Sequence, residues 1–371
     1  MKIIYLKPLS GYATPLRSDT LWGMLCWGIR HLWGDATLTT FLAACEAGQP
    51  PFVVSSTFPC KQYGKDWIPF FPNPLPFPDA HDVDLAIALK NAILRKKYKK
   101  ETAFVNLEDF TSILNGNLTA NDLRQRLRDV MDEEDRLAEE SKRTGKRKKE
   151  RAISEGEILQ TAPRCEDFSM THNTIDRLRG GTLSLPIEGS TQDETAGQLF
   201  HSPETFWTDP FSDPNQEPNT GIFFLADGPD LSLLEPVLRL FRHWGLGADR
   251  TTGKGFFDFE IQDFSLSTPA DANAMLTLSL FRPLPDELSA IDSFPVEDNR
   301  FKYRIELREG RVGHLHIDLK KQAHRYFTEG SVFPLLSGLT SRHLGGLVHQ
   351  FDKPHPVWDN GFGFMVHLKW Q

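Results

Sequence analysis

Apolar and polar positions near the amino terminus predict a strand, two helices and a second strand. Residues 3–7 alternate weakly between apolar and polar side chains, as a half-buried strand does. Apolar side chains then recur at helical spacing over 21–32. Ser18 or Asp19 is expected to cap this helix, because either side chain can accept from a free amide of its first turn. A short helix and a buried strand over 52–56 follow.

The middle of the chain begins with a proline-rich stretch and continues into helices. Five prolines lie between Pro69 and Pro78. Because proline cannot donate to a ladder, we expect an extended surface path there rather than a central strand. Phe70 and Phe71 on that path are then expected to stay partly exposed and to contribute to an interface. Helical periodicity predicts a mainly helical region over roughly 82–140.

The end of this helical region is strongly charged. Residues 132–140 are mainly acidic and residues 142–151 are mainly basic, so the two blocks roughly cancel each other. We interpret them as a solvated helix end followed by a mobile loop, and an RNA-contacting loop is the alternative.

A second succession of strand and helix follows. Residues 221–226 form an apolar strand, and a leucine-rich helix ends at Gly245. A glycine-rich loop over 245–255 leads into a strand over 256–261. Together with the first elements, this order is that of a split βαβ, or ferredoxin-like, unit. We expect strands 3–7 and 256–261 to lie on opposite edges of its sheet, with their adjoining loops at a shared end.

The predicted domain organisation is an N-terminal domain over 1–264, with an insertion over about 60–220, and a C-terminal domain over 274–371. A linker rich in Ser, Thr, Pro, Ala and Asp occupies 265–273. The second domain is predicted to be a degenerate ferredoxin-like unit, in which 319–327 forms either a helix or a strand. Its strands are expected at 275–281, 301–307 and 362–369. The predicted fold class is therefore α+β, with two ferredoxin-like (RRM-like, split βαβ) units.

Composition and charge limit the classes of function. The net charge of −8 argues against a free-standing, non-specific nucleic-acid binder, although it is compatible with a local basic groove. The four cysteines show no two-residue spacing, so we expect reduced cytosolic thiols and no zinc site. No apolar run is long enough to span a membrane, and the first residues do not resemble a signal peptide. A cytoplasmic location is therefore expected.

The glycine-rich loop carries the most informative chemistry. It contains Arg250, Thr251, Thr252 and Lys254 among four glycines. Glycine lets backbone amides approach a phosphate, and the two cations can neutralise it. The loop is not a P-loop, because it follows a helix and precedes a strand, and Gly255 stands where a magnesium-binding hydroxyl is needed. An ordinary charged turn is the alternative.

This arrangement resembles the RAMP proteins of CRISPR systems, in which a glycine-rich loop precedes the last strand of a ferredoxin-like unit. Other segments resemble the Csm-complex RAMP family that holds the 5′ handle of the crRNA. They are the opening at 14–26, the Phe/Pro stretch at 69–78, the start of a thumb hairpin at 171–177 and a C-terminal motif at 329–333. These landmarks follow the family's order and span nearly the whole chain. The runs at 142–151 and 190–220 depart from it, so the thumb boundaries within 178–220 are not placed.

The resemblance implies a non-catalytic crRNA-binding subunit of a type III-A CRISPR effector, the Csm complex, acting in RNA-guided antiviral defence. Such a subunit caps the 5′-handle end and links the large polymerase-domain subunit to the filament of backbone RAMP subunits. Its thumb hairpin would wedge into the guide–target RNA duplex. No cofactor and no metal are implied. The candidate RNA-binding residues are Arg17, Ser18, His172, Asn173, Arg177, Gly247, Arg250, Thr251, Thr252, Gly253 and Lys254.

His172 leaves a second function open. As a general base against an RNA 2′-hydroxyl, it would make the chain a metal-independent endoribonuclease that processes precursor crRNA. The sequence shows no second positioned acid, base or metal cluster for this role, and His172 is otherwise an RNA contact or a hairpin anchor. His314 and His316 share one strand face, where we expect solvent-facing side chains rather than a metal pair. A structural assembly protein without RNA contact is the third alternative.

Overall fold

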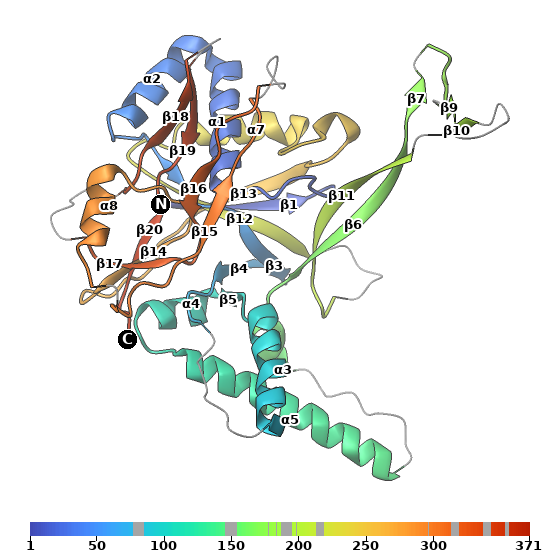
Figure 1. Cartoon of the computed structure of the whole chain (residues 1–371), viewed down its shortest axis with the longest axis vertical. Helices are drawn as coiled ribbons and strands as arrows, with labels where there is room; N and C mark the ends of the chain where they lie inside the picture. The colour runs from blue at the N-terminus through green and yellow to red at the C-terminus, as the bar shows by residue number, and fades with distance from the viewer. Residues whose placement is uncertain are drawn as a thin grey trace.

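The computed structural model describes residues 1–76, 85–144, 154–176, 178–182, 184–186, 195–197, 199–212, 219–295, 297–312, 319–336, 343–352 and 356–371. Figure 1 shows a sheet-rich body, a helical lobe built mainly from α3 (Leu85–Glu101) and α5 (Ala120–Thr144), and a long hairpin that projects from the body. Helices and antiparallel strand pairs are both abundant, so the fold is α+β as predicted. No helix among these residues is long and apolar enough to cross a membrane.

The largest sheet of the body has the strand order β13-β1-β12-β3-β4-β5, and a short strand, β2, also pairs with β12. All of its pairs are antiparallel. The strands are β1 (Lys2–Pro8), β2 (Val53–Val54), β3 (Phe58–Tyr63), β4 (Asp66–Pro72), β5 (Phe104–Asn106), β12 (Thr220–Asp227) and β13 (Phe257–Asp263).

The first strand lies inside this sheet. It pairs with β13 along its whole length, with Lys2 opposite Asp263 and Pro8 opposite Phe257. The expectation that strands 3–7 and 256–261 occupy opposite edges is therefore wrong. Four successive side chains of β1, from Ile3 to Leu6, are buried, and burial on both faces suits an inner strand rather than an edge.

Three helices accompany the sheet: α1 (Ser18–Trp33), α2 (Asp35–Glu46) and α7 (Leu234–Trp244). α1 packs against α2 and α7, and α7 also contacts β13. The approach of α1 to α7 is close at Gly28, where an added Cβ would lie 2.3 Å from Val237 Cγ1. This packing fixes the end of α7, from which the glycine-rich loop departs.

Ser18 does not cap α1, whereas Asp19 accepts from the amide of Thr20 in its first turn at 2.7 Å, as predicted for one of the two residues. Arg17 precedes the helix, and its side chain makes no capping hydrogen bond. Ser18 is fully buried, and its hydroxyl accepts from the backbone amide of Leu280 at 3.0 Å. The Asp19 carboxylate also pairs with Arg308 at 2.9 Å. The side chains of Ser18 and Asp19 therefore hold the N-terminal elements against the C-terminal part of the chain. No local sequence pattern indicates contacts between residues so far apart in the sequence.

The residues after β4 form a mainly helical lobe, as predicted for 82–140. α3 and α5 pack against each other, and α4 (Leu107–Leu114) lies on β4 and β5. Asn106 caps α4 by accepting from the amide of Asp109 at 2.9 Å. α6 (Glu155–Gln160) follows. The basic run from 145 onward lies outside the described residues, so neither interpretation of it is tested.

The proline-rich stretch begins as a strand rather than as a surface path, since residues 69–72 belong to β4, and its last residues, 77–78, lie outside the described part of the chain. Phe70 and Phe71 lie in β4 and are fully buried. Pro69 is the last residue of β4 that pairs with β3, and Pro72 is the last that pairs with β5. Each proline closes a short ladder instead of interrupting one, and for this reason the strand tolerates both. The ring of Phe71 stacks on that of Phe110 with centroids 4.5 Å apart, so the expected interface role of these phenylalanines is wrong.

The projecting hairpin consists of β6 (Arg164–Asn173) and β11 (Leu199–Thr208), whose residues pair throughout (Figure 1). At its base Tyr12 and Thr205 exchange two backbone hydrogen bonds of 3.1 and 2.8 Å. A hairpin was expected from 171–177 onward, and the observed one begins earlier, at Arg164. Shorter strands extend it: β7 (Ile175–Asp176) with β8 (Gly181–Thr182), and β9 (Ser184–Pro186) with β10 (Thr195–Gly197).

The described residues of the C-terminal part form short antiparallel strands and the helix α8 (Pro285–Asp292). The segment 319–327 ends in a strand rather than a helix. The predicted strands at 275–281, 301–307 and 362–369 are present in shorter form as β14, β15 and β20. The strands are β14 (Ala274–Thr277), β15 (Ile305–Arg308), β16 (His324–Phe327), β17 (Val332–Pro334), β18 (Leu347–Phe351), β19 (Val357–Asn360) and β20 (Met365–Leu368).

One hydrophobic core joins the two predicted domains. Leu276, Val332 and Leu368 belong to the same buried cluster as Ile4 and Phe224 of the main sheet. Elements on both sides of the 265–273 linker therefore pack together, and this continuity holds the C-terminal part firmly against the body that carries the loop and the hairpin.

Candidate functional site

The glycine-rich loop is closed at its base by its own backbone. Leu246 donates to the carbonyl of Gly255 at 2.8 Å. Gly255 has a φ of +74°, and an added Cβ would lie 1.9 Å from the Leu246 oxygen. Gly245 has a φ of +77°, and its added Cβ would lie 2.7 Å from the oxygen of Lys254. Only glycine fits these two positions, so the sequence pattern here reflects loop closure as well as access to a ligand.

The tip of the loop is exposed and carries the groups that a phosphate needs. Arg250, Thr251 and Thr252 form one exposed 3-10 turn. Within the described ranges Arg250 forms no ion pair, and the backbone amides of residues 248–251 donate to no acceptor. Gly253 has a φ of +90° and open space where a side chain would project. The Thr252 hydroxyl donates to the Asp249 carbonyl at 2.7 Å. The Arg250 cation, the Thr251 hydroxyl and the free amides are thus available together.

Lys254 lies beneath this tip and has a different role. Its side chain is 6% exposed, with Nζ 3.7 Å from Oε2 of Glu204 and 3.3 Å from the hydroxyl of Ser202, to which it donates. Glu204 and Ser202 belong to β11 of the hairpin. Lys254 therefore joins the glycine-rich loop to the base of the hairpin, and its cation is already paired.

The predicted residue His172 reaches the same joint. Its Nε2 lies 2.8 Å from the hydroxyl of Ser202, which also accepts from Lys254. Its ring stacks on that of Phe200 with centroids 5.2 Å apart. Ser202 thus brings together His172 and Lys254, which lie about 80 residues apart in the sequence. Ser202 itself was not predicted, because it belongs to no recognisable motif.

The hairpin presents an apolar face beside His172. Residues directly opposite one another on the two strands share a face, so His172, Phe200, Met170 and Phe168 lie on one side of the ladder. Phe200, Met170 and Phe168 are each about half exposed. Phe206 lies on the same side and meets Phe168 edge to face at 5.6 Å. The alternation of Phe168 and Met170 in β6 was the available signal, and it was not used. On β11 the same face also carries Ser202 and Glu204.

Asn173 is the last residue of β6. Asn173 donates through Nδ2 to the hydroxyl of Thr182 at 2.9 Å, so it ties β6 to β8. Arg177 lies outside the described residues. Gly247, in the loop, has a φ of +88° and lies against Leu16 and Thr14.

Arg17 and Ser18 face the C-terminal part instead of the loop. The Arg17 guanidinium donates to Glu329 at 3.0 Å and to Glu306 at 2.6 Å. Burial alone would lower the pKa of Arg17, but the hydrogen bonds and charges of these two carboxylates outweigh it and raise that pKa. Glu329 also accepts from Ser56. The motif segments at 14–26 and 329–333 therefore meet in space, and the buried Ser18 hydroxyl offers no accessible group.

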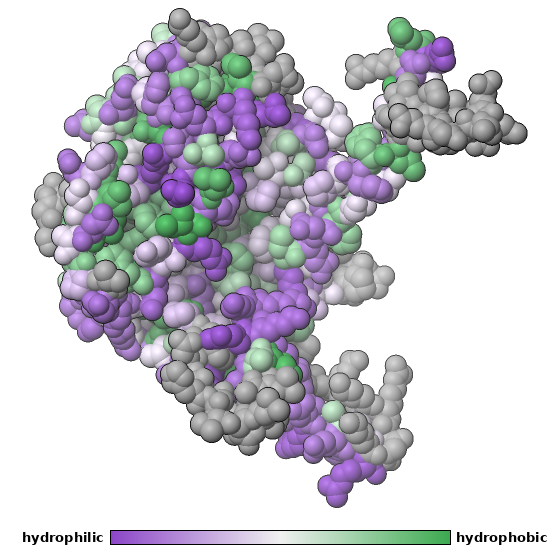
Figure 2. Space-filling view, viewed as in Figure 1, coloured by the Kyte–Doolittle hydropathy of each residue, from purple (hydrophilic) through white to green (hydrophobic). Residues whose placement is uncertain are grey.

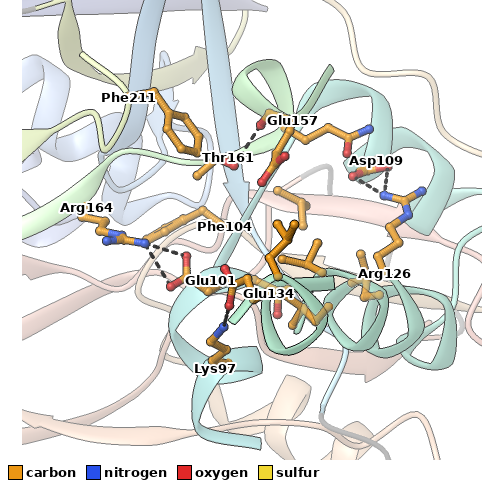
Figure 3. A pocket seen from close by; sticks show the side chains of 17 residues that line it. Lys97, Glu101, Phe104, Asp109, Arg126, Glu134, Glu157, Thr161, Arg164 and Phe211 are labelled. Carbon is orange, nitrogen blue, oxygen red and sulfur yellow. Dashed lines mark hydrogen bonds and ion pairs between the residues drawn. The ribbon is translucent and has the colours of Figure 1, made fainter. Parts of the chain in front are cut away.

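A separate cavity of about 680 Å³ lies between α3, α5 and α6 (Figure 3). Its charged side chains are paired within the protein, Lys97 with Glu134, Glu101 with Arg164 and Asp109 with Arg126. None of the predicted site residues lines it. Within the described part of the chain, no three His, Cys, Asp or Glu side chains are grouped as metal ligands would be.

Comparison with known proteins gives matches only at the level of structure. No family model and no curated protein matches the sequence. A chain of the "Csm3-Csm4 subcomplex in the type III-A CRISPR-Cas interference complex" aligns with a TM-score of 0.56 and 15% identity over 100% of both chains. A chain of the "Csm1-Csm4 cassette in complex with cA4" aligns with a TM-score of 0.51 and 16% identity, over 100% of this chain and 98% of that one. The chain therefore shares its fold with these proteins over its full length.

Proposed function

We propose that this protein is a non-catalytic, crRNA-binding RAMP subunit of a type III-A CRISPR effector, which caps the 5′-handle end of the crRNA. The observation that carries the proposal is the joint between loop and hairpin. Lys254 holds the loop against Ser202 and Glu204, and His172 contacts the same Ser202 hydroxyl, while Arg250 stays exposed at the tip of the loop. The full-length likeness in fold to chains of Csm complexes supports the same conclusion.

The described chemistry suits a single RNA strand. Arg250 and the free amides of residues 248–251 would hold phosphates, and the exposed Thr251 would add a hydrogen bond. The half-exposed rings of Phe200 and Phe168 would stack on bases that leave the loop. Asp249 is the one exposed carboxylate of the loop. Because its charge repels phosphates, the RNA backbone would pass on the Arg250 side.

The strand order supports a finer description of the fold. The order β13-β1-β12-β3, with α1 after β1 and α7 after β12, is that of a split βαβ unit. We infer that this unit carries the helical lobe as an insertion and the β6–β11 hairpin as its thumb. The sheet of β14, β17 and β20 would form the second, degenerate unit.

The partners follow from the proposed place in the effector. The matched structures are described as complexes of Csm4 with Csm1 and with Csm3. For this chain we infer the corresponding contacts, with the large polymerase-domain subunit on one side and a backbone RAMP subunit on the other. The hairpin would reach the guide–target duplex on the side of the backbone subunit.

The test of RNA binding is the substitution Arg250→Ala, with Arg239→Ala as the matched control. Arg239 is also exposed, but it pairs with Glu235 at 2.5 Å on α7. Loss of one phosphate contact should weaken binding of handle RNA roughly tenfold and flatten the log–log salt dependence by about one unit, as measured by fluorescence anisotropy. Unchanged affinity in Arg250→Ala would exclude the loop as the RNA site.

The non-catalytic part of the proposal is tested with precursor crRNA in the presence of EDTA. The Nε2 atom of His172 is already hydrogen-bonded to Ser202, which positions the ring as an anchor of the hairpin. We therefore expect intact RNA after incubation. Specific cleavage that is lost in His172→Ala would establish the endoribonuclease instead.

A further inference from the structure

A cleft in the C-terminal part lies apart from the loop and the hairpin. It has a volume of about 900 Å³ and is bounded by the start of α8, the β15–β16 pair and the start of β18. None of the candidate RNA-binding residues lines it. The cleft is therefore available for another ligand while RNA occupies the loop.

The rim of the cleft is apolar. Leu284, Leu288, Ile305 and Leu307 all line it, and each is 42% to 59% exposed. Figure 2 shows apolar side chains gathered over the area of β15 and β16, surrounded by polar ones. A group of exposed leucine and isoleucine side chains around one cleft is typical of a protein-binding surface.

The inner wall of the cleft carries polar groups that lack partners. Arg282 Nη1, His324 Nε2 and Tyr326 Oη are buried, and none of them has a hydrogen-bond partner among the described residues. His324 and Tyr326 alternate on β16 and so share a face, and both feel the charge of Arg282. An unpaired buried donor is costly, and three of them beside one cleft indicate an acceptor that the isolated chain does not supply.

The charge of the cleft is one-sided. Arg282, Arg325, His324 and His349 line it, and no Asp or Glu is among its described lining residues. The charge of Asp359 also acts on His324 and Tyr326, but this carboxylate is already paired with Lys321 and Gln350. Burial raises the pKa of Tyr326, so its phenol stays protonated and can donate. Burial lowers the pKa of His324, which favours its neutral form. Arg282 and Arg325 therefore supply the positive charge of the cleft. Arginine binds carboxylates through paired hydrogen bonds, so an acidic side chain is the complementary group.

From this complementarity we propose that the cleft is the docking site for an apolar segment of the large polymerase-domain subunit, which inserts one Asp or Glu side chain toward Arg282 and Tyr326. The choice of partner rests on the proposed function. In Figure 1, α8 lies on the side of the body away from the hairpin. We expect the RNA and the backbone subunit to bind on the hairpin side. Of the two protein partners, the large subunit is therefore the one that would bind at this cleft.

The first experiment measures affinity for the purified large subunit and, separately, for handle RNA. Leu288→Ser with Leu307→Ser should weaken binding of the large subunit at least tenfold and leave RNA affinity unchanged. Ile93→Ser is the control, since Ile93 is 48% exposed on α3, away from the cleft. Equal affinity of the double variant and wild type for the large subunit would overturn the inference.

The second experiment separates docking from a structural role. Tyr326→Phe removes a buried hydroxyl that has no partner, so the Tm of the isolated chain should stay the same or rise while affinity for the large subunit falls. A photoreactive residue in place of Leu307 should then cross-link to the large subunit next to an Asp or Glu. Changing that acid to its amide should weaken binding of the large subunit. When this change is combined with Arg282→Gln, the affinity should fall no further.

The outcomes distinguish this inference from the proposed function. Cross-linking of position 307 to the backbone subunit, or to an apolar segment without an acid, overturns the inference alone. Binding of handle RNA without any binding of the large subunit does the same. Failure of the wild-type chain to bind either of them overturns both.

Discussion

Replacing Lys254 by methionine removes the cation that joins the glycine-rich loop to the hairpin. The Lys254 side chain is 6% exposed and that of Glu204 is 13% exposed, with Nζ 3.7 Å from Oε2. Removing one partner of a buried pair costs about 3–5 kcal/mol, because the other charge is left without compensation. Glu204 keeps some solvent contact, so we expect the free energy of unfolding to fall by about 3 kcal/mol, the lower end of that range.

Urea denaturation measures this loss, and hydrogen exchange locates it. The amides of Tyr12 and Thr205 bond to each other's carbonyl groups at the hairpin base, and their protection should fall in Lys254→Met. Adding Glu204→Gln should recover most of the stability, since it removes the stranded charge. A loss below about 1 kcal/mol with unchanged protection would refute the view that Lys254 joins the two segments.

Two further substitutions test the corrected assignments. Phe71→Ser should lower the free energy of unfolding by at least about 3 kcal/mol, because the ring is fully buried and stacked on Phe110; a stable, more soluble variant in thermal denaturation would restore the interface assignment. Arg17→Leu should cost about 3 kcal/mol in urea denaturation by leaving the part-buried Glu329 unpaired, and the additional change Glu329→Gln should return part of it. Equal stability of Arg17→Leu and wild type would show that the contact is not needed for folding.

Local patterns were sufficient for the order of the elements. The apolar alternation around Ile4, the helical spacing that ends at Gly245 and the helical lobe before Arg164 all depend on neighbours close in the sequence. The glycine-rich loop was recognisable for the same reason. Glycine is required at 245 and 255 by close contacts with the backbone of Lys254 and Leu246, each only nine residues away in the sequence.

Contacts between distant residues account for what the sequence could not predict. Proline at 69 and 72 argued against a strand, yet both fit because β4 changes its pairing partner from β3 to β5 between them. Serine is a common helix cap, but the Ser18 hydroxyl accepts a hydrogen bond from the backbone amide of Leu280 instead. Lys254 looked like a free cation because Glu204, fifty residues earlier, gave no sign that it lies beneath the loop.

Photo-cross-linking of bound crRNA that carries 4-thiouridine in its 5′ handle tests the central claim most directly. Mass spectrometry of the cross-linked peptides identifies the protein residues that lie against the handle. The account predicts peptides from the 245–255 loop and from the β6–β11 hairpin. Cross-links confined to other parts of the chain, with the RNA bound, would contradict it.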